Sequence, residues 1–155
     1  MKQIHADRGV KCYYRGTRKR RVRARGVTFW VEEEGAGRPL LLIHGGPGAD
    51  HRSLHPGLSV LAKSRRLIYV DLRGHGMSSE ARKYGLEVDA DDVEALRRAM
   101  KLGKLDALGH SYGGAVVLKW AARHPAGAGK IVVCSTPLGA SDRQILARMA
   151  RDPRA

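Results

Sequence analysis

The chain has 155 residues, of which 43% are hydrophobic, and its formal net charge is +14. This length suits one domain with one hydrophobic core. No segment approaches the roughly 20 consecutive apolar residues of a membrane span, and charged residues interrupt residues 1–10 where a signal peptide would be apolar. Two cysteines are too few for a disulfide framework or a zinc site. We therefore expect a cytoplasmic protein with Cys134 in its core.

The positive charge is concentrated at the N-terminus. Residues 1–25 hold ten Lys and Arg against one acid and carry +9, whereas residues 26–155 hold 19 Lys and Arg against 14 acids and carry +5. A basic arm of this kind can bind a nucleic acid or an anionic surface through charge alone. No nucleic-acid-binding motif accompanies it. We therefore expect a flexible, solvated arm over residues 1–19 and no nucleic-acid partner.

Strand-like and helix-like segments alternate along the rest of the chain. In chain order, we expect a strand hairpin over 21–24 and 27–33, a strand over 39–44, a helix over 51–63 with Pro56 near its start or breaking it, a strand over 66–71, a helix over 88–102 closed by Gly103, a strand over 104–108, a helix over 115–122, a strand over 130–135 and a helix over 142–151 capped by Ser141. Several of these strands are continuous apolar runs, which is typical of strands buried on both faces. The pattern predicts a three-layer α/β/α sandwich around a mostly parallel sheet.

The most informative motif lies between a predicted strand and a predicted helix, and it reads Gly109-His110-Ser111-Tyr112-Gly113. A serine in this context is typical of a nucleophile elbow, a sharp turn that presents the hydroxyl at the edge of a sheet. The glycines leave room where the turn is too tight for side chains. The backbone N–H of Tyr112 would then face an oxyanion that forms beside Ser111.

Two further loops follow predicted buried strands and should open at the same edge of the sheet. The first reads His44-Gly45-Gly46-Pro47-Gly48. Pro47 has no N–H to donate, so the second oxyanion donor would come from Gly45 or Gly46, and we favour Gly46. We expect Gly45, Pro47 and His110 to contact substrate. The other loop, residues 71–76, reads Asp-Leu-Arg-Gly-His-Gly.

These three motifs, in this order and spacing, resemble those of the α/β-hydrolase family over about residues 22–137. The resemblance implies that Ser111 is the nucleophile and that Arg73 organises loops. Epoxide hydrolases and dehalogenases of the family carry Asp at the position of Ser111. Pro47 resembles the proline iminopeptidase branch, but the elbow has the general hydrolase form. The resemblance therefore implies a serine hydrolase acting on an amide, peptide or ester bond of a small molecule or peptide, without a metal or organic cofactor.

A base and an acid for Ser111 are not found by sequence. The family order is Ser, acid, His, but His124 ends the helix that leads away from Ser111, and Asp142 falls where a helix cap is expected. His51 and His55 follow the first loop, and we expect them at the surface. We therefore expect the chain to represent the first two-thirds of a hydrolase and to be weak or inactive alone.

The expected organisation is a basic arm over 1–19, a partial hydrolase core over 20–140 and the start of a lid-like helix over 141–155. The core would be incomplete at its C-terminal side, because a sheet ending at residues 131–133 leaves an apolar edge unpaired. A truncated hydrolase, a chain whose edge is covered by a partner chain or a second copy, and a degenerate binding protein remain open. The last would use the basic arm to hold a nucleic acid or an anionic surface.

Overall fold

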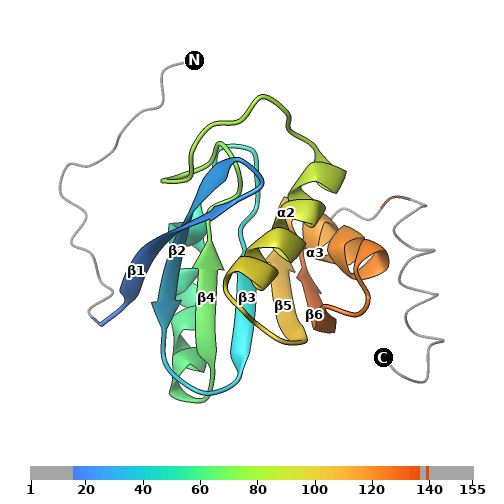
Figure 1. Ribbon diagram of the computed structural model, residues 1–155. Helices are drawn as coiled ribbons and strands as arrows, with labels where there is room; N and C mark the ends of the chain where they lie inside the picture. Colours follow the sequence, from blue (N-terminus) through green and yellow to red (C-terminus); the bar gives the residue numbers. More distant parts are fainter. Residues whose placement is uncertain (1–15, 137–138, 140–155) are drawn as a thin grey trace.

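The computed structural model describes residues 16–136 and 139 (Figure 1). The predicted helix over 142–151, its cap at Ser141 and Cys12 lie outside these residues. The elements are β1 (Arg18–Ala24), β2 (Val27–Glu34), β3 (Pro39–Ile43), η1 (His51–Ser53), α1 (His55–Leu58), η2 (Ser59–Lys63), β4 (Arg66–Val70), α2 (Leu86–Ala99), β5 (Leu105–His110), α3 (Tyr112–Arg123) and β6 (Ala128–Cys134).

One sheet of six strands in the order β1-β2-β4-β3-β5-β6 organises the described chain. The hairpin β1–β2 is antiparallel and β2 pairs antiparallel with β4, whereas β4, β3, β5 and β6 run parallel. The predicted mostly parallel sheet with helices is therefore confirmed. Among the described residues, β6 has a strand on one side only, and Val132 on it is 48% exposed.

Helical segments cover both faces of the sheet (Figure 1). The face with α2 and α3 buries the larger apolar cluster, which includes Phe29, Ile68 and Trp120. The face with η1, α1 and η2 buries a smaller cluster around Leu42 and Tyr69. The alternation of side chains along β3 and β4 sends every second residue to each face, so both apolar clusters receive side chains from the same two strands.

Several expectations about the elements are wrong in detail. The helix predicted over 51–63 is three short segments, with Pro56 in the first turn of α1. Residue Gly103 does not close α2; the helix ends at Ala99, and Lys101 takes the left-handed backbone conformation with φ 54°. A C-terminal glycine is common but not required, because a hydrogen bond from the Leu102 N–H to Arg97 O satisfies a terminal carbonyl there.

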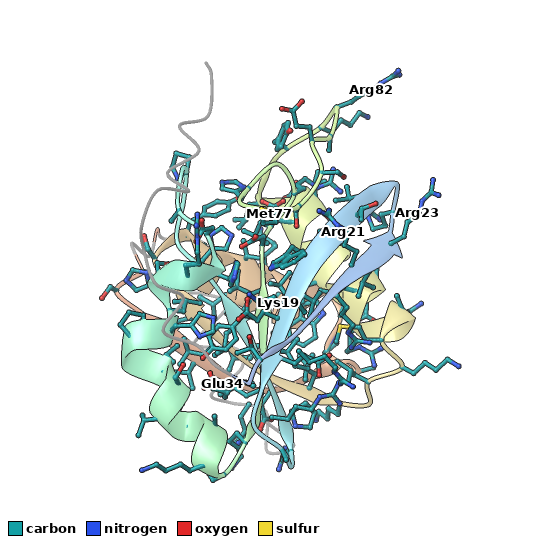
Figure 2. All side chains as sticks on the ribbon, turned by 90° about the vertical axis from the view of Figure 1, so that its left-hand side faces the viewer. Lys19, Arg21, Arg23, Glu34, Met77 and Arg82 are labelled. Carbon is teal, nitrogen blue, oxygen red and sulfur yellow. The ribbon has the colours of Figure 1, made fainter. Side chains whose placement is uncertain are left out.

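The described part of the basic arm belongs partly to the fold. Strand β1 begins at Arg18, so residues 18 and 19 are part of the sheet rather than of a flexible arm. Buried Glu33 receives ion pairs from Arg18 and Arg20 at 3.0 and 2.7 Å. The Arg21 side chain donates to the Met77 carbonyl, and Figure 2 shows it beside Met77, while Arg23 reaches into solvent. These contacts favour a structural role for much of the charge on β1.

No helix within the described residues has the length and apolar character needed to cross a membrane.

Candidate active site

The turn at Ser111 has the geometry of a nucleophile elbow. Ser111 lies between β5 and α3 with φ 52° and ψ −119°, a backbone conformation that non-glycine residues rarely adopt. Two hydrogen bonds hold it there, from Ser111 N–H to the Cys134 carbonyl at 2.8 Å and from Gly114 N–H to the Ser111 carbonyl at 3.0 Å. Backbone strain of this kind is concentrated at functional sites.

Glycines make this turn sterically feasible. A Cβ at Gly109 would collide with the backbone of Gly113, and a Cβ at Gly113 would collide with the carbonyl oxygens of Ile43 and His44. The close approach therefore involves the backbone of β3 as well as that of the elbow. It brings the end of β3, where the glycine loop begins, directly against the first turn of α3.

The glycine loop after β3 lies beside the elbow. A Cβ at Gly45 would be 3.2 Å from Ser111 Cβ, and one at Gly46 would be 3.7 Å from Tyr112 Cδ1. His44 holds this loop, because its Nδ1 bonds to the Gly45 carbonyl and its Nε2 accepts from the Leu72 N–H at 3.1 Å. In a trans peptide the N–H points opposite to the C=O. The N–H of Gly46 is thus directed away from His44.

The sequence did not single out His44 for this role. Its ring is fully buried, and burial lowers its pKa below the ordinary value despite the hydrogen bond to the Gly45 carbonyl. A neutral imidazole is the form that can donate through Nδ1 and accept through Nε2 at the same time. His44 is therefore a loop-orienting residue, and the only signal for it in the sequence was its place directly before the glycines.

A pocket of about 390 Å³ opens at this edge of the sheet. Five of the six residues that the sequence singled out for substrate or catalysis line it, and the sixth, Tyr112, directs its hydroxyl to Asp89 at 2.6 Å instead. Most of the other lining groups are apolar. The lining residues are Gly45, Gly46, Pro47, Ala49, Ser53, Leu54, Gly57, Leu58, Leu108, His110, Ser111 and Cys134.

Cys134 is exposed in this pocket and does not lie in the core as predicted. Strand β6 is at one end of the described sheet, and its residues alternate between partly buried and exposed along 129–134. The apolar run of β6 resembled that of a central strand, but its position at the end of the sheet leaves alternate side chains uncovered. Its pairing with β5 through His110 places Cys134 at the elbow.

His51 and His55 are buried and not at the surface, which corrects the sequence prediction. His51 Nδ1 lies 2.7 Å from Asp71 Oδ1, and its Nε2 lies 3.2 Å from Glu32 Oε2. Burial opposes a charge on His51, but the hydrogen bonds and negative charges of Asp71 and Glu32 raise its pKa to about 9. Burial would raise the pKa of Glu32, yet the hydrogen bonds and positive charges around it, those of His51 first, lower it to about 2.

The loop after β4 is held by a second set of buried charges, here called the Arg73 cluster (Arg73, Asp89 and Asp92). Arg73 Nε and Nη2 both donate to the carboxylate of Asp92 at 2.6 Å, and Nη1 donates to the Lys83 carbonyl at 2.8 Å. The predicted loop-organising role of Arg73 is thus confirmed. Asp89 and Asp92 were missed, because their place among the acids of α2 gave no sign that they are buried.

Four of the described histidines bond to groups other than Ser111. His44 and His51 are hydrogen-bonded elsewhere, and His75 Nδ1 bonds to the Arg73 carbonyl at 2.9 Å. His124, as predicted, ends α3, and it bonds to Asp91 at 2.8 Å. About twelve helical residues, at 1.5 Å each, separate it from Ser111 by roughly 18 Å. Asp142 and Asp152 lie outside the described residues.

The parallel sheet, the strained serine between β5 and α3 and the glycine loop beside it define a class of protein. A model of the alpha/beta hydrolase fold matches residues 38–154, and the chain belongs to this family.

Three curated relatives show how broad the family is around this chain. An AB hydrolase superfamily protein, YisY, of Bacillus subtilis is 38% identical over 63% of this chain and 37% of its own length. A 2-hydroxymuconate semialdehyde hydrolase of a Pseudomonas species is 37% identical over 68% of this chain and 39% of its length. A proline iminopeptidase of Heyndrickxia coagulans is 34% identical over 68% of this chain and 37% of its length. The chain thus spans about two-fifths of these relatives.

Solved structures agree on the fold. A membrane phospholipase A superposes with a TM-score of 0.74 at 27% identity, over 79% of this chain and 40% of that one. The haloalkane dehalogenase DatA of Agrobacterium tumefaciens superposes with a TM-score of 0.71 at 26% identity, over 90% of this chain and 50% of that one. The chain is therefore similar to proteins of several activities, which share the sheet and its covering helices.

Proposed function

We propose that this chain carries the nucleophile and oxyanion site of a serine hydrolase that cleaves amide, peptide or ester bonds. The observation that carries the proposal is the backbone of Ser111, held at φ 52° beside the glycine loop. The Ser111 hydroxyl would attack the substrate carbonyl carbon. The N–H groups of Tyr112 and Gly46 would stabilise the negative oxygen, and one such donor typically contributes about 3 kcal/mol to the transition state.

A serine at position 111 favours acyl transfer over the chemistry of the aspartate-dependent branches. A serine attacks a carbonyl and forms an acyl-enzyme, which water then hydrolyses. This step needs a base to take the hydroxyl proton and an acid to orient that base. In the family order both follow Ser111, and we expect them outside the described residues.

The lining of the pocket supports a substrate with an apolar acyl group. Leu54, Leu58 and Leu108 contribute apolar surface, and Pro47 contributes it on the side of the glycine loop. A proline-like first residue would fit such a pocket, and so would a short fatty acyl chain. Proline iminopeptidase activity is the narrower form of the proposal, supported by Pro47 and by relatives of that name.

A fluorophosphonate probe tests the proposal, because it forms a covalent bond with an activated serine hydroxyl. We expect labelling of the purified chain at residue 111, located by peptide mass spectrometry, and no labelling of Ser111→Ala. Ser53→Ala is the matched control, since Ser53 lines the same pocket but its hydroxyl donates to the Asp50 carbonyl. Slow labelling is expected if the base is missing.

The same samples can then be tested with a series of p-nitrophenyl acyl esters and with proline p-nitroanilide. Faster turnover of the anilide would support the iminopeptidase form, and faster turnover of the esters would support an esterase. Labelling that persists in Ser111→Ala, or that is equally lost in Ser53→Ala, would contradict the assignment of Ser111 as the nucleophile.

A further inference from the structure

A second cluster of chemically active side chains lies on the opposite side of the helical segment that walls the pocket. His51 and His55 are four residues apart on η1 and α1, so their rings lie on one side of this segment. Glu32 faces them from β2, beside Tyr69 of β4. The side chains of the three residues are 5%, 0% and 4% exposed. None of them lines the pocket at Ser111.

The ligand atoms of these residues converge. His51 Nε2 lies 3.2 Å from Glu32 Oε2, and His55 Nε2 lies 3.9 Å from Glu32 Oε1. One ligand atom from each residue lies within 4.8 Å of the other two. Zinc bonds of about 2.0–2.1 Å in a tetrahedral arrangement place neighbouring ligand atoms about 3.3 Å apart. The two rings would therefore need only a small movement to hold an ion.

The other nitrogen of each ring already has the partner that a metal-binding histidine usually has. His51 Nδ1 faces Asp71 Oδ1 at 2.7 Å, and His55 Nδ1 faces Ser59 Oγ at 3.2 Å. A ligating histidine almost always donates its second N–H to a carboxylate or another acceptor, which fixes the ring and the tautomer. The His55 ring is also stacked on Tyr69 with centroids 3.8 Å apart. Both rings thus present Nε2 to Glu32.

One carboxylate oxygen of the cluster accepts no hydrogen bond. Among the described residues, Glu32 Oε1 is buried and accepts no hydrogen bond. A buried carboxylate oxygen without a partner is costly. A divalent cation between Oε1 and the two rings would remove this cost, and it would take the place of the proton that His51 Nε2 holds beside Glu32, which is released on binding.

We propose that Glu32, His51 Nε2 and His55 Nε2 form a binding site for a divalent transition-metal ion, with zinc as the best match. Two imidazoles and one carboxylate are a ligand set that zinc accepts. Three protein ligands leave the fourth position of a tetrahedral ion to a water. The burial of all three residues favours an ion that stabilises the fold over one that takes part in catalysis. The ion would fasten the segment from η1 to α1, which carries the pocket-lining residues Leu54 and Leu58, to β2.

A neighbouring group, Asp50, His51 and Asp71, also brings ligand atoms together. Both oxygens of Asp71 are already used there, because Oδ1 accepts from the His51 N–H and Oδ2 accepts from the Met77 N–H, each at 2.8 Å. Asp50 is in turn engaged by Arg52. The structure therefore favours Glu32 and His55 as the residues that bind the ion together with His51. His55 belongs to this group and not to the other, so a substitution of His55 tests which group binds the ion.

The test uses the untagged chain, stripped with a chelator and titrated with zinc against a chromophoric chelator. We expect one ion per chain and a higher melting temperature with zinc. The variants His55→Gln and Glu32→Gln should each weaken binding by about 100-fold or more. His124→Gln is the matched control, because this histidine pairs with a carboxylate, Asp91, outside the cluster. It should bind zinc as the unchanged chain does.

Cobalt(II) provides a measurement that needs no variant. Bound by two imidazoles, a carboxylate and a water in a tetrahedral arrangement, it should give intense visible absorption that is lost when zinc displaces the cobalt. The absence of saturable binding to the stripped, folded chain would overturn the proposal. Binding of unchanged strength in both His55→Gln and Glu32→Gln, with circular dichroism showing that they fold, would overturn it as well.

Discussion

The elbow at Ser111 and the Arg73 cluster lie at neighbouring loops, yet different forces hold them. The elbow depends on backbone groups that approach so closely that Gly109 and Gly113 have no room for a Cβ. The Arg73 cluster depends on charged side chains that are buried and paired, with Arg73 and Asp92 only 6% and 2% exposed. Tyr112 connects the two, because its N–H lies in the elbow and its hydroxyl donates to Asp89. Steric fit thus controls one region, and electrostatic compensation controls the other.

The largest loss of stability is expected when a single carbon atom is added to the elbow. In Gly113→Ala the new Cβ would meet the carbonyl oxygens of Ile43, the last residue of β3, and of His44, whose buried ring is hydrogen-bonded on both sides, so neither can easily move away. We expect a loss of about 3 kcal/mol or more in the free energy of unfolding, measured by urea denaturation. Gly103→Ala is the control, because a Cβ there meets nothing within 4 Å. Equal stability of the two variants would show that the elbow is not tightly packed.

The second largest loss of stability is expected when the buried ion pair between Arg73 and Asp92 is broken. Arg73→Gln would leave Asp92 buried with only the partly exposed Arg25 beside it, so we expect a loss of about 3 kcal/mol in denaturation experiments. Arg52→Gln is a matched control, since Arg52 makes a similar two-nitrogen contact with Asp50 but is 64% exposed. That variant should lose less than about 1 kcal/mol. Similar losses in both variants would mean that burial adds nothing to the Arg73–Asp92 pair.

A third effect should appear as a pH dependence of stability. Hydrogen bonds from Arg97, opposed by burial and reinforced by Trp120 and Arg98, lower the pKa of Glu94 to about 2. Because this pKa is lowered, ionised Glu94 stabilises the fold when the pH is above 4.5, the ordinary pKa of a glutamate, and this stabilisation is lost as the pH falls toward 2.

Urea midpoints between pH 5 and pH 2.5 would measure this loss. We expect about 2 kcal/mol, after allowing for solvent around the exposed Arg98. The Glu94→Gln variant should show a flatter profile over the same range. An unchanged profile in that variant would assign the acid sensitivity to other carboxylates.

The smallest loss of stability is expected at Tyr112, which connects the elbow to the Arg73 cluster. Tyr112→Phe keeps the backbone N–H in the elbow but removes the hydroxyl that donates to Asp89 at 2.6 Å. We expect a loss of about 1 kcal/mol in thermal or urea unfolding, since Asp89 loses one hydrogen bond and the ring remains in place. A loss as large as that of Gly113→Ala would mean that the hydroxyl, and not the close backbone approach, determines the geometry of the turn.

Patterns among residues close together in the sequence predicted the hairpin, the parallel strands and the elbow. The hairpin at residues 25–26, the parallel strands and the elbow follow from alternation, apolar runs and glycine spacing, and the structure has them. The sequence left open whether Pro56 lies near the start of the helix over 51–63 or breaks it, and the structure has three short segments there, with Pro56 in the first turn of the second. The exposure of Cys134 depends on which strand lies at the end of the sheet, and sequence alone does not reveal this order.

The order of motifs along the chain determined that Ser111, the glycine loop and the Arg73 loop meet at one edge of the sheet, because parallel strands bring their carboxyl ends together. Only the tertiary structure decided which polar residues are buried. His51, Asp92 and Glu32 have polar side chains that local patterns assign to the surface, yet each is buried because a partner from a distant element compensates its charge. Such pairs join residues 19 positions apart in both cases, and no local propensity encodes them.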